Sequence, residues 1–545
     1  MSDSPRRHNP YLPLIFSLLL VSAFIFGMRY NRLGMGMNHK TIFGNHPNQF
    51  NKINDVINYI NDSYVDSVNP KMLVENTIEA MLHQLDPHSA YIPAEQVSSV
   101  HESLEGNFEG IGIEFHLQDD TIMVVTVVSG GPSDQLGIQS GDRIVKIDDK
   151  NFAGIHITND DVLKNLRGPG GTKVKVSILR RGQNHFIDFN IKRGKIPLYS
   201  VDVAYMLDVE TGYIKISTFG ETTYDDYLNA FMKLKGMDMK NLVLDLRGNP
   251  GGYLNTAVKI ADEFLSDHKM IVYTKGRIHR NEEYRATTRG FFEQGKLIVL
   301  IDEGSASASE IVSGALQDWD RATIVGRRSF GKGLVQEENS FPDGSAIRLT
   351  IARYYTPTGR SIQKPYDKGY EDYSHELMDR IKKGELESID SISFPDSLKF
   401  TTPSGHTVYG GGGIMPDVFV PLDTSFNTDF YSDAMADGLV VQFAYDYLDR
   451  NRGHFNKYRG FDEFNKSFSV TDDIYKHFAD YAVKSGIKKN EQAIKRSSPL
   501  IRNLIKAYIA RQLYKNDGFY PVIHQMDEAL KKAMELMHSE EVSEK

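Results

Sequence analysis

The spacing of apolar positions divides the chain into segments of different kinds. Ile53, Val56 and Ile60 recur at intervals of three and four residues, which predicts amphipathic helices after residue 50. From about residue 105 to 195 the apolar residues instead form short runs separated by Gly, Pro and Asp, a pattern typical of strands and turns. The chain therefore begins with helices and continues into a small β-domain.

The next segment alternates between strand and helix patterns. Leu242 to Leu246 and Leu297 to Ile301 are largely apolar runs with the length of buried strands, and helical patterns follow them. Such alternation predicts a parallel-type α/β core. Further on, Leu500, Leu504 and Tyr508 lie at helical spacing, and a stripe of this kind usually packs in a core or an oligomer contact.

An uncharged stretch of 18 residues, Tyr11 to Met28, follows Arg6 and Arg7. It has the minimum length for a membrane-spanning helix, and the basic flank predicts that the short N-terminal end stays in the cytoplasm. A cleaved signal peptide is the alternative, although Gly27 to Tyr30 offers no small-residue cleavage site. We expect a single-pass anchor in the cell membrane, with the rest of the chain on the extracytoplasmic, periplasmic side.

Composition sets limits on the remaining possibilities. The chain has 545 residues and 40% hydrophobic content, enough for several cores, and its net charge of −9 offers no general attraction to nucleic acid. It has no cysteine, which excludes disulfides and thiolate metal sites. The predicted parts are a cytoplasmic tip and anchor (1–30), a helical N-terminal domain (31–100), a β-domain (101–195), an α/β core (196–422) with an exposed charged insertion at about 364–400, and a helical C-terminal region (423–545).

Two short motifs in the α/β segment carry the candidate chemistry. The sequence S-A-S-A-S-E (305–310) places small hydroxyl residues where a strand gives way to a helix, and F-G-K-G-L-V-Q (330–336) places Lys332 between two glycines. A serine hydroxyl needs a nearby base, and an amine is a base only when it is neutral. Because burial can lower a lysine pKa by several units, the apolar neighbours Phe330 and Leu334 favour that role.

A third motif supplies the place for an oxyanion. The strand Leu242 to Leu246 runs into Asn249-Pro250-Gly251-Gly252, where glycines can turn backbone N–H groups inward. Two such donors form the hole that acyl transfer requires. Serines at this position are otherwise helix caps, a role that Ser305 or Ser309 can fill.

A nucleotide-binding interpretation competes with this one. Gly326 to Lys332 reads G-x-x-x-x-G-K, as in a phosphate-binding loop, and Leu242 to Asp245 resembles the strand that holds magnesium in P-loop NTPases. Gly333, however, stands where that loop needs Ser or Thr, and the Asp-bearing strand precedes the lysine loop instead of following it. The NTPase is therefore the weaker interpretation.

Taken together, the motifs resemble those of the C-terminal processing, or tail-specific, serine peptidases, over roughly residues 56 to 420. The resemblance implies that Ser307 is the nucleophile, that Lys332 is the general base and that Gln336 orients the lysine. It also implies a ClpP/crotonase-like arrangement of the core and the absence of a metal or organic cofactor.

Further roles follow from the same resemblance. It implies that the oxyanion donors are the N–H groups of Ala308 and of Gly251 or Gly252, and that Asp318 is a possible accessory residue. The motif L-D-P-H-S-A-Y-I (85–92) matches a family signature, and for its His88 a capping or packing role is favoured over a metal or triad role.

The β-domain resembles a PDZ domain inserted into the peptidase. A Gly-rich segment before a strand can capture a terminal carboxylate while the strand edge pairs with an extended peptide. A simple spacer domain is the alternative. The residues predicted to bind the substrate tail are Gly110, Ile111, Gly112 and Ile113.

The sequence thus predicts a membrane-anchored serine endopeptidase that cleaves polypeptides with accessible C-termini near those ends. Two alternatives stay open besides the NTPase: a non-catalytic PDZ-containing adaptor and a Ser-His-Asp triad built from one of the 17 histidines. The C-terminal helices are a cap on the catalytic domain, the interface of a possible homodimer or a platform for a partner, and the sequence does not choose among these roles.

Overall fold

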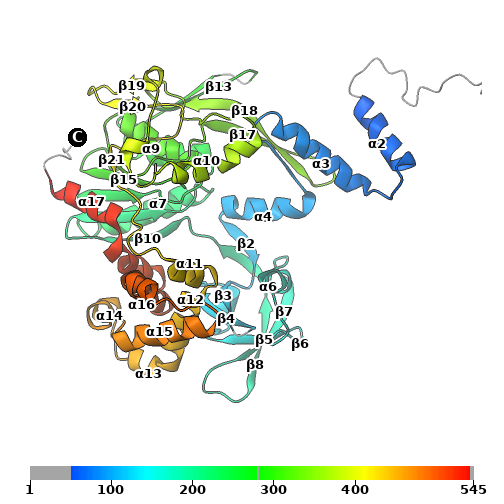
Figure 1. The fold of residues 1–545 in the computed structure, drawn as a ribbon, viewed down its shortest axis with the longest axis vertical. Coiled ribbons are helices and arrows are strands. Elements are labelled where there is room, and N and C mark those ends of the chain that lie inside the picture. Colours follow the sequence, from blue (N-terminus) through cyan, green and yellow to red (C-terminus); the bar gives the residue numbers. More distant parts are fainter. Residues whose placement is uncertain (1–50, 119, 279–280, 540–545) are drawn as a thin grey trace, which may run out of the picture. The chain divides into compact units, whose positions relative to one another are not determined.

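The computed structural model describes residues 51–118, 120–278 and 281–539 (Figure 1). The described residues fall into two compact units, which divide between Met81 and Leu82. In the first unit, α2 (Asn51–Ser63) confirms the helix predicted from the apolar spacing, and α3 (Pro70–His83) begins there. Ile53 and Val56 of α2 are 42% and 44% exposed, so this helix keeps an apolar face in contact with solvent.

The predicted anchor, Tyr11 to Met28, lies outside the described residues. Within the part of the chain that the structure does describe, no helix has both the length and the apolar character needed to cross a bilayer.

The centre of the second unit is a six-stranded sheet that confirms the predicted α/β core. A β10–β11 hairpin opens the sheet and the remaining neighbours pair in parallel. Helices α7 (Thr223–Lys235), α8 (Leu254–Asp262) and α9 (Ala308–Asp318) pack on one face. The strands, in spatial order, are β10 (Val201–Met206), β11 (Thr211–Ile216), β12 (Asn241–Asp245), β15 (Leu297–Ile301), β16 (Thr323–Gly326) and β21 (Val418–Phe419).

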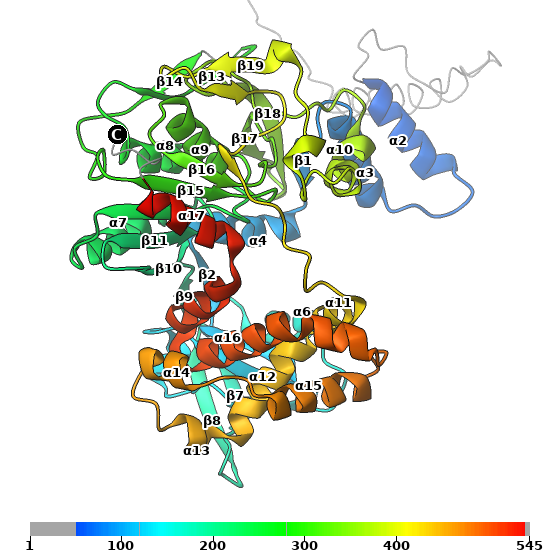
Figure 2. The same ribbon diagram turned by 60° about the vertical axis from the view of Figure 1, so that its left-hand side comes forward.

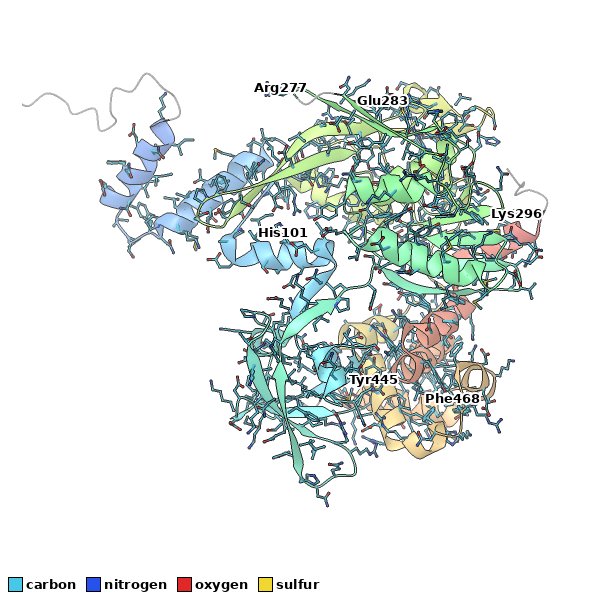
Figure 3. All side chains as sticks on the ribbon, turned by 180° about the vertical axis from the view of Figure 1, so that it is seen from behind. His101, Arg277, Glu283, Lys296, Tyr445 and Phe468 are labelled. Atoms are coloured by element: carbon cyan, nitrogen blue, oxygen red, sulfur yellow. The ribbon has the colours of Figure 1, made fainter. Side chains whose placement is uncertain are left out.

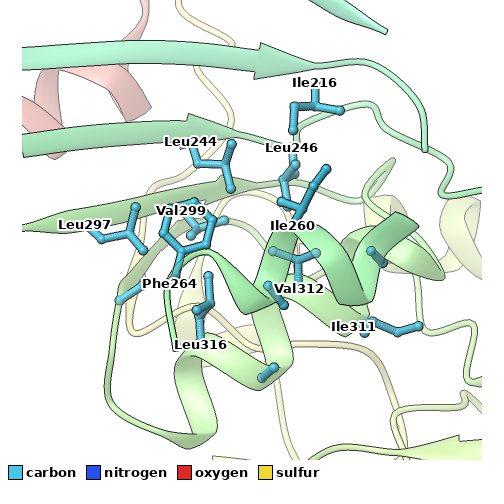
Figure 4. Close-up of a cluster of buried hydrophobic side chains, with 14 of the residues drawn as sticks. Ile216, Leu244, Leu246, Ile260, Phe264, Leu297, Val299, Ile311, Val312 and Leu316 are labelled. Carbon is cyan, nitrogen blue, oxygen red and sulfur yellow. The ribbon is translucent and has the colours of Figure 1, made fainter. Parts of the chain in front are cut away.

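The continuous apolar runs in β12 and β15 arise because both faces of the sheet are covered. Leu244 and Val299 point to one face, where they contact Phe264 of the turn after α8 and residues of α9 (Figure 4). Val243 and Ile298 point to the other face and pack against α17 (Glu528–His538).

A second, antiparallel sheet carries the lysine motif. Its strands are β1 (Ala90–Ile92), β18 (Ala346–Tyr355), β13 (Met270–Gly276), β14 (Glu282–Arg285) and β17 (Leu334–Ser340). Lys332 lies two residues before β17, and Gln336 lies within that strand. Strand β1 brings the signature segment before it, with His88, to the same sheet by pairing with β18.

The β-domain is inserted through a two-stranded ribbon. Strand β2 (Asn107–Gly110) leads into the domain after α4 (Ala94–Glu105), and β9 (Gly194–Pro197) leads out and pairs with β2. Strand β3 forms one edge of the domain's sheet. The elements of the domain are β3 (Ile113–Gln118), β4 (Thr121–Val127), α5 (Pro132–Gln135), β5 (Arg143–Ile147), β6 (Lys150–Asn151), α6 (Asn159–Leu166), β7 (Lys173–Leu179) and β8 (Phe186–Lys192).

The C-terminal region is helical, as predicted, but it does not form one body. Most of its helices share a core of their own, whereas α17 joins the catalytic sheet (Figures 1 and 2). Lys296, at the start of β15, donates to the carbonyls of Met537 and Ser539 at the end of α17 (Figure 3). The helices before α17 are α11 (Asp429–Ala436), α12 (Leu439–Arg450), α13 (Arg452–Phe455), α14 (Phe461–Ser467), α15 (Asp472–Lys484), α16 (Glu491–Ile523) and the 3₁₀ turn η3 (His524–Met526).

Most residues of the charged insertion are exposed, as its composition predicted, but a few of its side chains are buried. It contains α10 (Tyr370–Lys382) and the 3₁₀ turns η1 (Ile389–Ser391) and η2 (Asp396–Leu398), and it ends at β19 (Lys399–Thr401), which pairs with β20 (Thr407–Tyr409). Lys364 and Arg380 are only 3% and 4% exposed. These two side chains depart from the expected exposure because the Glu376 carboxylate and the Ser329 carbonyl supply partners for their charges.

Candidate active site

Ser307 lies at the turn between β15 and α9 in a strained conformation. Its φ is 52° and its ψ −109°, a region that costs a non-glycine residue about 1–3 kcal/mol. The flanking serines fix this turn, since Ser305 Oγ donates to the Leu246 carbonyl (2.8 Å) and Ser309 Oγ to the Asn249 carbonyl (2.9 Å). The Ser307 hydroxyl lines a cavity at the N-terminal end of α9, where the helix dipole favours negative charge.

Lys332 is held at the same cavity by a short chain of hydrogen bonds. Its Nζ donates to Gln336 Oε1 (3.0 Å), and Gln336 Nε2 donates to the carbonyl of His88 (2.6 Å). Burial lowers the pKa of Lys332, and the positive charge of Arg348 lowers it further, against the opposing effect of Asp86 and Glu310. The side chain therefore has the environment that a neutral amine requires.

Ser307, Lys332 and Gln336 are brought together in one cavity of about 610 Å³. Lys332 Nζ donates to Gln336 in this structure and not to Ser307 Oγ. The other lining residues come from α4, the Gly251-Gly252 loop, α9 and the sheet around β17, among them Val100, His101, Leu104, Thr218, Leu254, Ile311, Leu334, Glu338 and Tyr354.

The structure distinguishes between the two glycines proposed as oxyanion donors. The Gly251 N–H donates to Asn249 Oδ1 (2.9 Å). Gly251 is therefore not free to bind an oxyanion, although the sequence left it as one of two candidates. Gly251 instead permits close packing, since a Cβ there would lie 2.7 Å from the Ser307 Cβ. In the described part of the chain, the amides of Gly252 and Ala308 carry no hydrogen bond and belong to the two segments that meet at Ser307.

Glu310 organises the site, although the sequence analysis gave it no role. Its buried carboxylate accepts from the N–H groups of Ser307 (2.8 Å), Gly331 (2.7 Å) and Lys332 (2.8 Å), and from Ser329 Oγ (2.5 Å). Burial raises the pKa of Glu310, and these four donors oppose that rise. The capping-box spacing from Ser307 to Glu310 was the visible signal for the first contact.

The same contacts argue against the phosphate-loop interpretation. A phosphate cradle needs backbone N–H groups that point at the ligand. Here the amides of Gly331 and Lys332 point at the Glu310 carboxylate, which would repel a phosphate.

Asp318 lies apart from the cavity, at the far end of α9. Eleven residues of helix separate it from Ser307, a rise of about 16 Å. The carboxylate is buried against Arg360 (2.7 Å) and accepts from the Thr358 N–H (2.9 Å) and hydroxyl (2.7 Å). The structure therefore places the predicted accessory residue in an ion pair that holds the β18–insertion junction, away from Lys332.

Two histidines lie near the predicted pair. Burial, followed by the charge of Lys332, lowers the pKa of His88 to about 3, so its ring is neutral, and its ring nitrogen contacts the Tyr373 hydroxyl (2.6 Å). This agrees with the packing role that the sequence favoured. His101 lines the cavity, where its Nε2 is bound to Glu338 (2.5 Å).

In the β-domain, the segment Gly110–Ile113 has its carbonyls turned inward. The Ile111 carbonyl accepts from the N–H and the hydroxyl of Ser133, and the Gly112 carbonyl accepts from the Val128 N–H. Strand β3 follows directly and pairs within its sheet only with β4 among the described strands, which leaves its outer edge for an added strand.

Comparison with known proteins agrees with this fold. A family model described as "Peptidase family S41" matches residues 210–370, and one described as "PDZ domain" matches residues 110–191. Residues 32–96 match a model described as "Activating protease CtpB N-terminal domain", and residues 430–515 match a "Family of unknown function (DUF8443)". The chain is therefore a multidomain α+β serine-type peptidase with a PDZ domain.

Two bacterial relatives cover the catalytic part. The carboxy-terminal-processing protease of Bartonella bacilliformis is 39% identical over 321 residues, which are 58% of this chain and 73% of that protein. The carboxy-terminal processing protease CtpA of Bacillus subtilis is 34% identical over 322 residues, 58% and 67% of the two chains. A solved photosystem II D1 C-terminal processing protease shares 24% identity, covering 70% of this chain and 89% of that one, with a TM-score of 0.36. The chain belongs to peptidase family S41, the carboxy-terminal processing proteases.

Proposed function

We propose that this peptidase cleaves polypeptides near their C-termini with Ser307 as nucleophile and Lys332 as general base. The observation that carries the proposal is the pairing of the Lys332 ammonium with a neutral amide, Gln336, in a buried position that lowers the lysine pKa. A neutral amine that lines the same cavity as a strained serine can serve as the base for its hydroxyl proton.

The steps follow from the positions of these groups. Ser307 Oγ attacks the scissile carbonyl carbon while its proton passes to Lys332 Nζ, and the N–H groups of Ala308 and Gly252 bind the oxyanion. Lys332 then returns the proton to the leaving amine as the C–N bond breaks. Water, deprotonated by the same lysine, hydrolyses the acyl-enzyme and restores the Ser307 hydroxyl. Gln336 keeps the amine in place throughout.

We infer that the PDZ domain binds the free C-terminal tail of the substrate. The inward carbonyls of Ile111 and Gly112 leave the N–H groups of Ile111 to Ile113 for a carboxylate, whereas Gly110 pairs with Gly194 in the ribbon of β2 and β9, and the open edge of β3 suits an extended peptide. This arrangement would select substrates by an accessible end.

Other parts of the proposal rest on the sequence. We propose that residues 11–28 form an uncleaved anchor and that the catalytic part lies on the extracytoplasmic, periplasmic side. We also propose the domain limits given above, a ClpP/crotonase-like core and a homodimer. Membrane fractionation of the full chain against a chain that starts at residue 31 tests the anchor. Sedimentation of the full chain in detergent tests the homodimer.

The catalytic assignment is tested with Ser307→Ala and Lys332→Ala on an unstructured peptide with a free C-terminus. Both variants should lose cleavage by at least about a thousandfold. His101→Gln is the matched control, because His101 lines the same cavity and would be the base of a Ser-His arrangement. Cleavage by Lys332→Ala at the wild-type rate, or its loss in His101→Gln alone, would refute the lysine base.

Tail recognition is tested separately with the same peptide carrying a C-terminal amide. The amide should raise the KM and leave the kcat nearly unchanged, because only binding through the PDZ domain is lost. Equal KM values for the acid and the amide would reject recognition of the terminal carboxylate without affecting the catalytic assignment.

A further inference from the structure

Helix α10 of the charged insertion packs directly on the loop that carries Lys332. Its buried face presents Tyr373 and Arg380, which are 7% and 4% exposed. Lys382, two residues further, has a side chain that is 71% exposed. The helix therefore has one face committed to the loop and one in solvent.

Arg380 binds the two carbonyls that precede the Gly331-Lys332 pair. Its Nη1 donates to the Ser329 carbonyl (2.8 Å) and its Nη2 to the Phe330 carbonyl (3.2 Å). The Phe330 carbonyl belongs to the same planar peptide group as the Gly331 N–H, which donates to Glu310 on the opposite side. Arg380 and Glu310 thus hold the two ends of one rigid plane, which fixes the direction in which the chain enters Lys332.

Tyr373 connects α10 to the amine itself. The Tyr373 hydroxyl contacts the His88 ring nitrogen (2.6 Å), and the His88 carbonyl accepts from Gln336 Nε2 (2.6 Å). Gln336 in turn accepts from Lys332 Nζ. Loss of the hydroxyl would free the His88 ring, and through it the segment that orients Gln336.

Lys364 completes the contact between the insertion and the loop. Its backbone N–H donates to the Gly331 carbonyl (3.0 Å), and its Nζ lies 4.1 Å from the ring centres of both Phe330 and Tyr373. The ammonium also donates to Glu376 Oε2 (3.0 Å), and the Glu376 Oε1 accepts from Arg380 Nε (2.5 Å). The buried charges form one paired network around the loop.

We propose that Arg380 and Tyr373 are positioning residues for the general base, so that the insertion is part of the catalytic machinery and not a surface addition. This inference rests on the proposed role of Lys332. Neither residue touches the substrate; each acts by fixing the loop or the amide that holds the amine.

The test uses the full-length protein with Arg380→Gln, Tyr373→Phe and Arg380→Lys, and Lys382→Gln as the matched control on the exposed face. Two readouts are taken: kcat and KM on the free-tail peptide, and the rate at which a fluorophosphonate labels Ser307, which needs no PDZ binding. We expect Arg380→Gln and Tyr373→Phe to lower kcat and the labelling rate about tenfold with KM changed less than about twofold. Arg380→Lys should recover part of the loss, and Lys382→Gln should match the wild type.

Wild-type labelling rates in folded Arg380→Gln and Tyr373→Phe proteins would overturn the inference. If Arg380→Gln does not fold, Tyr373→Phe decides, because it removes one oxygen atom and leaves no unpaired charge. Lys332→Ala in the same assay separates the two proposals. Full activity of Lys332→Ala would reject the lysine base. If Lys332→Ala is inactive while the Arg380 and Tyr373 variants keep the wild-type rate, only the positioning role is rejected.

Discussion

Asp527, the N-cap residue of α17, forms a two-point ion pair with Arg247. Arg247 Nη1 donates to Asp527 Oδ1 (2.9 Å) and Nη2 to Asp527 Oδ2 (2.7 Å), while the same guanidinium binds Asp245 at the end of β12. Arg247 begins the loop that continues to Gly252. The C-terminal helix is therefore tied to the start of the loop that contains Gly252, the proposed oxyanion donor.

We expect Asp527→Ala to lower the free energy of unfolding by about 3 kcal/mol, because it leaves a buried guanidinium with one partner fewer. The kcat should fall as well, since the loop after Arg247 loses its anchor. The matched control is Glu528→Ala, whose side chain is 51% exposed. Thermal melting and peptide cleavage measure the two effects, and an unchanged melting temperature in Asp527→Ala would contradict the expectation.

Arg348 should set the lower limit of the active pH range. Burial is the largest cause of the lowered Lys332 pKa, and the charge of Arg348 is the next. An amine is a base only after it loses its proton, so kcat/KM should rise with pH through the lysine pKa. Arg348→Gln raises that pKa, and the rising limb of the profile should move to higher pH. Arg353→Gln, on the same strand, is the control, and a limb that moves to lower pH would refute the argument.

Glu310→Gln should disable the site although the new side chain has nearly the same size. The glutamine amide has the size of the glutamate carboxylate. Its NH₂ group, however, would face backbone N–H donors that now bind a carboxylate oxygen, so the hydrogen bonds on that side of the Glu310 side chain would be lost. We expect a loss of at least about a hundredfold in kcat, since small displacements of reacting groups have effects of this size. Glu337→Gln, on the exposed side of β17, should keep its activity. Comparable kcat values for the two variants would show that the hydrogen bonds to the Glu310 carboxylate are dispensable.

His524 should make the protein less stable in mild acid. Burial lowers its pKa to about 4, and its Nδ1 contacts the Tyr205 hydroxyl (2.6 Å) between α16 and the sheet. The unfolded chain takes up the proton near pH 6.5, so between about pH 6.5 and 4 the unfolded state binds more protons and stability falls as the pH falls. The difference in melting temperature between the wild type and His524→Gln should become smaller as the pH is lowered through this range. The exposed His375→Gln is the control, and a constant difference for His524→Gln would count against a neutral buried ring.

Several features of the fold were predictable because their signals are local. The runs in β12 and β15 present apolar side chains to both faces of the sheet, and helices cover both faces. The helical spacing of Ile53 and Val56 likewise predicted α2. The lysine between two glycines, and the serine before a helix, identified two segments that the structure places at one cavity.

Other features depended on side chains that meet from distant parts of the chain. The choice between Gly251 and Gly252 as oxyanion donor depended on where the Asn249 amide points. The charged composition of the insertion indicated exposure, yet Arg380 is buried because the carbonyls of Ser329 and Phe330 accept its protons. Nothing in the local sequence indicates which carbonyls a guanidinium will find.

The sequence by itself determined the strands, the helices and the chemical types at the predicted active site, since these depend on residues within one or two turns of each other. Only the tertiary structure decided how Lys332 is held, through His88, Gln336 and α10, and that Asp527 would meet Arg247, 280 residues away. The physical reason is that a polar group buried by folding must find a partner wherever the packed chain provides one, and that partner is fixed by the path of the whole backbone.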